Sequence, residues 1–159
     1  MANRIGLFVD IQDMYENVSR KFRKKKLDYK KFLEYVNDLG KVVIAKAYGR
    51  QLTNEAVGFL NCLKKFGYLV SYRKVTAHSN DRWDVGITVD IFSELENIDT
   101  VVIGASHRNF LPLINKLLIL GKRVLVIGAQ IDPAVKTVTQ SYVEVTLSML
   151  EEKDDIANK

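Results

Sequence analysis

Carboxylates stand at two positions where a sheet-based enzyme would hold reactive groups. Asp10 ends the apolar stretch of residues 4–10, and an acid at the carboxyl end of a buried strand faces the crevice above the sheet. Asp84 opens the segment 83–95, on the side of an apolar helical stripe that includes Ile87. Converging carboxylates repel one another unless a cation lies between them, and oxygen ligands favour Mg²⁺ or Mn²⁺. Such ions orient phosphodiesters and activate water.

A third polar cluster follows a β-branched run but contains no acid. It reads Ser106-His107-Arg108-Asn109, between the strand-like VVIG and an apolar helical pattern. His107 and Asn109 are able to ligate a metal, and a histidine would favour Mn²⁺ or Zn²⁺ over Mg²⁺. In the alternative interpretation, His107 hydrogen-bonds the turn and Asn109 is the N-cap of the following helix. Ser106 would then support the turn.

Two further acids have plainer interpretations. Asp13 falls near the start of the first expected helix, where an acid caps backbone N–H groups. Asp90 is six residues beyond Asp84 and is rotated away from it, which indicates a supporting or surface position. Asp81 and Thr53 are expected N-caps of the helices that follow them.

The remaining pattern predicts how these residues are positioned. Near-continuous β-branched runs alternate with amphipathic segments, which is typical of a parallel sheet covered by helices on both faces. Strands are expected at 4–10, 42–49, 68–75, 100–104, 123–128 and 142–147, and helices at 11–24, 29–39, 54–66, 83–95 and 111–120. The fold class is therefore α/β, a Rossmann-like three-layer α/β/α sandwich with a mainly parallel sheet. Residues 1–150 are expected to form a single domain, and 151–159 a polar tail.

Composition narrows the class of protein. The chain has 159 residues, of which 47% are hydrophobic, and a single cysteine. These values favour a globular protein without an intrachain disulfide or a cysteine-based zinc site. No stretch has the length of a membrane span and no signal peptide is evident, so a cytoplasmic location without membrane contact is expected.

Positive charge is concentrated in one stretch. The net charge is +5, and residues 20–31 hold eight of the 24 lysines and arginines. Such a run attracts nucleic acid, or it is a solvated helix end. In the first interpretation the phosphate contacts come from Lys24, Lys25, Lys26 and Lys30, joined by Arg108. Tyr29 would stack on a base.

Three segments together resemble the NYN domain, a branch of the PIN-like ribonuclease superfamily. They read LFVDIQDMY, RWDVGITVDIF and NFLPLINKLLILGKRVLVIGA, and the resemblance covers nearly the whole chain. The family's Asp-x-x-Asn motif is matched by Asp10 and Asp13. Its Val-Asp-Val helix start, with a second acid six residues later, is matched by Asp84 and Asp90. The resemblance implies a PIN-like fold, an RNA substrate and Mg²⁺ or Mn²⁺, with Asp10 and Asp84 as catalytic metal ligands.

The third motif departs from the family. Where relatives have Ser-Gly-Asp-x-Asp-Phe, this chain reads Ala-Ser-His-Arg-Asn-Phe over residues 105–110, with His107 and Asn109 in place of both acids. The loss of two negative charges predicts weak or absent metal binding, with His107 and Asn109 as replacement ligands or as structural residues. The hypothesis is a metal-dependent ribonuclease with weakened activity; the alternative is an inactive RNA- or protein-binding module. A mononucleotide-binding domain is disfavoured because no Gly-x-Gly-x-x-Gly follows the first strand. A homodimer and a protein partner are left open.

Overall fold

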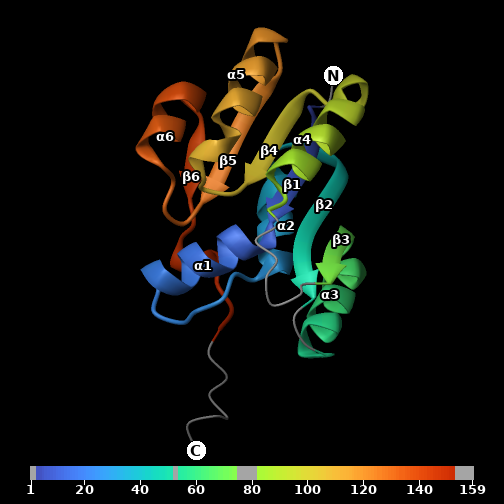
Figure 1. Ribbon diagram of the computed structural model, residues 1–159, viewed down its shortest axis with the longest axis vertical. Coiled ribbons are helices and arrows are strands. Elements are labelled where there is room, and N and C mark those ends of the chain that lie inside the picture. The colour runs from blue at the N-terminus through green and yellow to red at the C-terminus, as the bar shows by residue number, and fades with distance from the viewer. Residues whose placement is uncertain (1–2, 52–53, 75–81, 153–159) are drawn as a thin grey trace, which may run out of the picture.

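Parallel strands alternate with helices along the computed structural model (Figure 1), which describes residues 3–51, 54–74 and 82–152. The strands are β1 (Arg4–Asp10), β2 (Lys41–Gln51), β3 (Leu69–Lys74), β4 (Thr100–Gly104), β5 (Arg123–Gly128) and β6 (Tyr142–Glu144). The helices are α1 (Ile11–Lys21), α2 (Tyr29–Leu39), α3 (Asn54–Phe66), α4 (Asp84–Ser93), α5 (Leu111–Ile119) and α6 (Pro133–Thr139). Short 3₁₀ turns lie at Leu95–Asn97, Arg108–Phe110 and Leu147–Met149.

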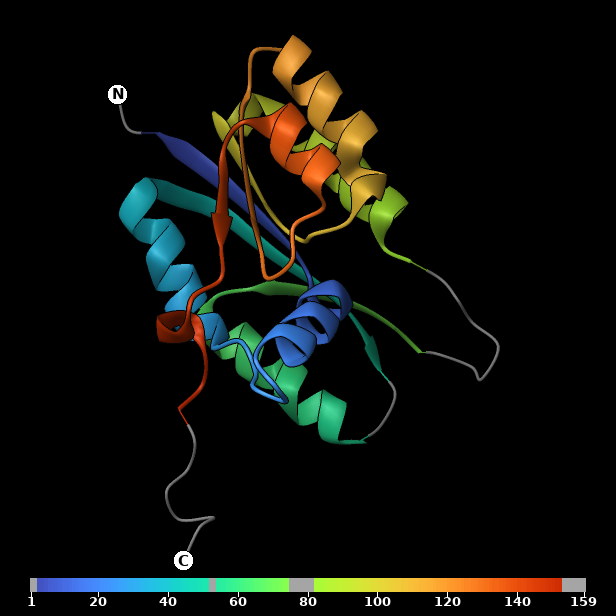
Figure 2. The ribbon, with the colours of Figure 1, turned by 90° about the vertical axis from the view of Figure 1, so that its left-hand side faces the viewer.

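The strands form one six-stranded sheet in the order β3-β2-β1-β4-β5-β6, and every neighbouring pair is parallel. Helices α1–α3 cover one face and α4–α6 the other, as the side view in Figure 2 shows. Side chains on β1 alternate between the two layers: Leu7 and Val9 pack under α1–α3, whereas Phe8 packs under α4–α6. The predicted three-layer Rossmann-like α/β/α fold is confirmed.

Several predicted boundaries were wrong. Helix α1 ends at Lys21 rather than residue 24, because Arg23 and Lys24 adopt left-handed backbone conformations with φ of 47° and 65°. The last strand is only Tyr142–Glu144. Helix α6 was not predicted, although Asp132 caps it by accepting a hydrogen bond from the backbone N–H of Ala134. Thr53 and Asp81, the expected N-caps, lie outside the described residues.

The order of the strands positions the site. Strand β1 leads into helices on one face and β4 into helices on the other, so the connections diverge between these neighbouring strands. Val9 pairs with Gly104 in the β1–β4 register. Asp10 and the segment that follows β4 therefore lie side by side at the carboxyl edge of the sheet, where α/β folds bind ligands.

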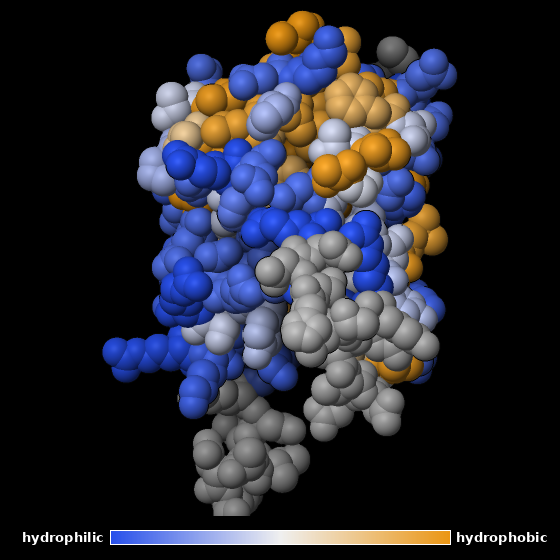
Figure 3. All heavy atoms as spheres, viewed as in Figure 1, coloured by the Kyte–Doolittle hydropathy of each residue, from blue (hydrophilic) through white to orange (hydrophobic). Residues whose placement is uncertain are grey.

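Polar and apolar side chains separate on the surface. Figure 3 shows hydrophilic side chains over α1 and apolar ones over α4 and α5. Val85, Val89 and Phe92 form an exposed apolar stripe on the outer side of α4, opposite the buried Ile87 and Ile91. Among the residues described, no helix has both the length and the apolar character needed to cross a membrane.

Candidate functional site

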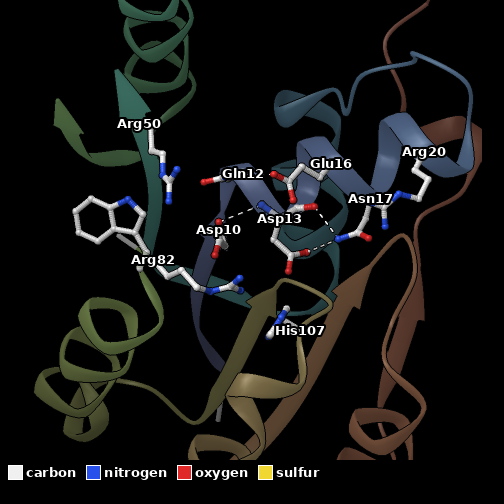
Figure 4. A pocket seen from close by; sticks show the side chains of 10 residues that line it. Asp10, Gln12, Asp13, Glu16, Asn17, Arg20, Arg50, Arg82 and His107 are labelled. Carbon is white, nitrogen blue, oxygen red and sulfur yellow. Dashed lines mark hydrogen bonds between the residues drawn. The ribbon is translucent and has the colours of Figure 1, made fainter. Parts of the chain in front are cut away.

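A cavity of about 430 Å³ lies at the divergence between β1 and β4. We call it the switch-point cleft; Figure 4 shows its side chains. Acids, arginines and neutral polar groups all contribute to it. Its lining residues are Asp10, Gln12, Asp13, Glu16, Asn17, Arg20, Arg50, Arg82, Trp83 and His107.

Asp10 is buried at the floor of the cleft, with 5% of its surface exposed. Its Oδ1 accepts a hydrogen bond from the backbone N–H of Asp13 at 3.2 Å, which makes Asp10 the N-cap of α1. Burial is the largest influence on this carboxyl and raises its pKa to about 6. The negative charges of Asp13 and Asp84 raise it further, whereas the Asp13 N–H and the Arg82 charge oppose the rise.

Asp13 joins the two sides of the cleft instead of capping α1 as predicted. Its Oδ1 accepts hydrogen bonds from the backbone N–H of Ser106 at 2.9 Å and from Asn17 Nδ2 at 3.1 Å. Burial raises the pKa of this carboxyl too. The capping prediction failed because Asp10 already occupies the N-cap, which leaves Asp13 directed across the sheet toward the loop after β4.

Ser106 is the residue of the loop after β4 that bonds to Asp13. The residue is 4% exposed, and its Oγ has no hydrogen-bond partner among the described residues. A Cβ at position 128 would overlap that oxygen, so Gly128 leaves the space that Ser106 fills. Ser106 therefore lies beneath the site rather than facing the cleft, and the supporting role expected for it stays a prediction.

Asp84 is engaged by two donors at the first turn of α4. Its Oδ2 accepts hydrogen bonds from Asn109 Nδ2 at 2.9 Å and from Arg82 Nε at 3.0 Å. Its Oδ1 is buried and has no partner among the described residues. The partner that an acid on an apolar helix face requires is thus supplied within the chain, by a guanidinium and an amide.

Arg82 is the cation nearest to the converging acids. Besides its bond to Asp84, its charge acts on both Asp10 and Asp13, and Figure 4 shows its side chain reaching toward them. The neighbouring Trp83 fixes the start of this segment, because Trp83 Nε1 donates to the carbonyl of Gly49 on β2 at 3.0 Å. A positive side chain therefore lies beside these acids and offsets part of their negative charge.

His107 has the structural role that the alternative interpretation gave it. Its Nδ1 accepts a hydrogen bond from the backbone N–H of Asn109 at 3.1 Å, which caps the 3₁₀ turn Arg108–Phe110. The prediction of Asn109 as an N-cap was wrong. Asn109 lies inside the 3₁₀ turn that His107 caps, and the N-cap of α5 is Phe110, so the Asn109 side chain reaches Asp84 instead.

These donors do not fit a divalent ion. Among the described residues, no three histidine, cysteine or acidic side chains gather closely enough to hold one. Asp84 Oδ2 is committed to two donors, and Asn109 directs its Nδ2, which has no lone pair to offer a metal, at that carboxylate. The four residues predicted as ligands lie near one another but do not form a coordination sphere.

Of the predicted site residues, Asp10, Asp13 and His107 line the cleft; Asp84, Ser106 and Asn109 bond to or pack beside its lining, and the others lie farther away. Asp90 accepts a hydrogen bond from Tyr48 Oη at 2.7 Å and pairs with Lys46 at 3.5 Å, which agrees with a supporting position. Arg108 pairs with Asp132 at 3.4 Å. The predicted phosphate-binding lysines lie in the segment between α1 and α2 and at the start of α2. Lys25 is half-buried, and Lys24, Lys26 and Lys30 are exposed.

Tyr29 is not available to stack on a base as predicted. It is 6% exposed, and its carbonyl accepts a hydrogen bond from Tyr68 Oη. The cleft also contains residues that sequence reasoning missed: Arg50 at the end of β2 and Arg82 before α4. Neither belongs to a recognisable motif; the only signal was that each stands beside the end of a strand or the start of a helix at the same sheet edge.

Comparisons with known proteins identify the family and the fold. The family model of the NYN domain matches residues 4–148. The uncharacterized protein MJ0482 of the archaeon Methanocaldococcus jannaschii is 28% identical over 151 residues, which are 94% of this chain and 57% of the relative. The chain thus spans little more than half the length of that relative.

A solved structure shows the same fold. The crystal structure of VPA0982, a protein of unknown function from Vibrio parahaemolyticus, superposes with a TM-score of 0.86 at 23% identity, covering 94% of this chain and 97% of that one. The matched family model extends over nearly the entire sheet and its helices. The chain belongs to the NYN domain family, within the PIN-like superfamily of nuclease-related folds.

Proposed function

We propose that this chain is an RNA-binding NYN protein that holds the phosphodiester backbone in the switch-point cleft and has weak metal-dependent cleavage or none. One observation carries the second part: Arg82 and Asn109 both donate to Asp84 Oδ2, the oxygen that an ion shared with Asp10 would otherwise use, and no other acid stands at positions 107 and 109. The arginines of the cleft support the first part, since guanidinium groups bind phosphate by paired hydrogen bonds. The net charge of +5 favours the same class of ligand.

We expect the Arg50→Gln, Arg82→Gln double variant to bind single-stranded RNA about tenfold more weakly or worse. Each lost phosphate contact should also lower the slope of log K against log salt by about 0.7. Fluorescence polarisation with a labelled RNA over a salt series measures both quantities. Trp83 is the only tryptophan and lines the cleft, so its emission reports independently whether RNA enters.

A matched control separates cleft contacts from general charge. Lys41 and Arg123 are exposed at the starts of β2 and β5, at the opposite edge of the sheet. Their double substitution to Gln removes the same charge. An equal loss of affinity in both double variants, with unchanged Trp83 emission on adding RNA, would contradict binding in the cleft.

The lysines between α1 and α2 extend the proposed surface. Neutralising Lys24, Lys25 and Lys26 with Gln should weaken RNA binding regardless of its sequence and lower the salt slope by about two. Binding titrations on two unrelated RNA sequences measure this, with Lys41, Lys116 and Arg123 changed to Gln as the control. Unchanged affinity at low salt would leave these lysines as a solvated connection.

A ribonuclease with residual Mg²⁺- or Mn²⁺-dependent activity is the second candidate. It is favoured by the closeness of Asp10 and Asp84, which is evident in the effect of the Asp84 charge on the pKa of Asp10. Cleavage of RNA by the unmodified chain in Mn²⁺, lost on Asp10→Asn, would establish it.

A homodimer stays a prediction, with the exposed stripe of Val85, Val89 and Phe92 as the surface to examine.

A further inference from the structure

A second cavity, of about 530 Å³, opens on the other side of α1. We call it the aromatic cavity. It shares Gln12, Glu16 and Arg50 with the switch-point cleft, so the two spaces adjoin. Its walls are mainly apolar, in contrast to the polar cleft beside it. A ligand long enough to leave the cleft past Arg50 therefore meets a surface of different chemistry.

Three aromatic side chains in the described part of the chain line this cavity, and two of them, Tyr15 and Phe59, are accessible to a ligand. Tyr15 on α1 is 60% exposed, whereas its neighbour Met14 is fully buried on another side of the helix. Phe59 on α3 is 36% exposed and lies edge-on against the ring of Tyr29, with 5.5 Å between centroids and 68° between planes. Phe59 is thus held in place by a buried neighbour, whereas Tyr15 presents its ring to the ligand.

A hydrogen-bonded pair stands at the boundary between the two spaces. Gln12 Nε2 donates to Glu16 Oε1 at 2.9 Å, one helical turn apart on α1. Between them these side chains offer amide donors and carboxylate acceptors. The edge of a nucleobase carries donors and acceptors of the same kinds, whereas its faces are flat and apolar. Lys26 and Arg50 line the cavity as well and are balanced by the acids Glu16 and Glu151, so its walls carry little net charge, as suits a neutral base.

We propose that the aromatic cavity binds an unpaired nucleobase of the single-stranded RNA whose backbone lies in the switch-point cleft. The base stacks on Tyr15 and Phe59, and its edge meets the Gln12–Glu16 pair. This inference rests on the proposed function. A base is favoured over an apolar side chain of a protein partner because the cavity adjoins the cleft proposed to hold the RNA backbone and shares Arg50 with it.

Tyr15→Ala provides the test. The titration uses a short single-stranded RNA and the same RNA with abasic riboses at its central positions. We expect Tyr15→Ala to weaken binding of the intact RNA about tenfold, since stacking on an aromatic side chain contributes strongly for each base. Binding of the abasic RNA should not change, and Tyr15→Phe should keep the wild-type affinity. Tyr142→Ala is the control, because Tyr142 is an exposed tyrosine that lines neither cavity.

Crosslinking locates the base directly. An RNA containing 4-thiouridine, irradiated on the wild-type protein, should attach to the peptides that carry Tyr15 or Phe59. Equal affinity of wild type and Tyr15→Ala for the intact RNA would overturn the base site, and so would crosslinks found only on other peptides. Either result would also be the one expected if a protein partner, and not a base, fills the cavity. If the base site is overturned in this way but the Arg50→Gln, Arg82→Gln variant binds RNA more weakly than wild type, the proposed function stands without the base site. If no RNA binds even to the wild-type protein, the proposed function itself fails.

Discussion

The His107→Asp, Asn109→Asp double variant should gain an Mn²⁺-dependent stability that the wild-type protein lacks. Asn109 Nδ2 lies 2.9 Å from Asp84 Oδ2, so an aspartate there sets two carboxylates against each other. Without an ion this repulsion destabilises the folded state. With Mn²⁺ at a hundredfold excess over its dissociation constant, the variant should regain about 2.7 kcal/mol. Thermal unfolding in chelator and in Mn²⁺ measures the difference.

Two features of the site allow this variant to fold. An aspartate at position 107 retains an acceptor for the backbone N–H of residue 109, as an N-cap requires. The Arg82 side chain is nearly half exposed and is able to turn into solvent. Asn115→Asp, an exposed change of the same type on α5, is the control and should show no response to Mn²⁺.

Cleavage gives the second measurement on this variant. RNA hydrolysis should appear or increase with Mn²⁺ and disappear when Asp10 is also changed to Asn. A folded variant that gains neither stability nor activity would show that the site has lost more than two carboxylates. If instead the wild-type protein cleaves RNA with Mn²⁺ and the variant is slower, His107 and Asn109 are working ligands, contrary to the structural roles inferred for them.

Asp10→Asn should stabilise the protein at neutral pH by about 2–3 kcal/mol. Burial raises the pKa of this carboxyl from 3.8 to about 6. Between these values the folded state binds more protons than the unfolded state, so stability falls as pH rises from about 4 to 7 and then levels off. Asparagine removes the charge and still caps α1, because its side-chain oxygen accepts the same N–H bond.

Urea unfolding at pH 4 and pH 7.5 measures this effect. The two proteins should differ little at the lower pH and most at the higher. Some pH dependence of the same sign should persist in the variant, because burial also raises the pKa of Asp13. Asp38→Asn, at an exposed position on α2, is the control. Identical pH dependence in wild type and Asp10→Asn would show that Asp10 is no more buried in solution than an ordinary surface acid.

Local sequence was enough to predict most of the sheet, because strands buried on both faces carry β-branched residues almost without interruption. Local sequence also predicted that Asp10 and the segment after β4 lie at the same edge of the sheet, since the carboxyl ends of parallel strands meet at one edge. Helix α6 was missed because its seven residues are too few to show a period. The Asp132-Pro133 start was the available signal.

The contacts within the site could not be predicted from local sequence, because they join residues that are far apart in the chain. Asp13 meets a backbone N–H 93 residues away, and Asn109 meets an acid 25 residues away. Nothing local distinguishes an asparagine that caps a helix from one that reaches a neighbouring element. Arg82 was missed for a related reason, since arginines beside helix starts are common and only the packing of Trp83 against β2 directs this one toward the acids.

The hydrogen bond between Asp84 and Asn109 also bears on how such a site evolves. Clustered like charges lower the stability of a fold, and selection retains them only while catalysis needs them. An amide opposite a carboxylate replaces that repulsion with an attraction. Once cleavage is no longer under selection, drift toward a more stable fold would preserve this pair, while a return to aspartate would carry a thermodynamic penalty until metal binding also returned.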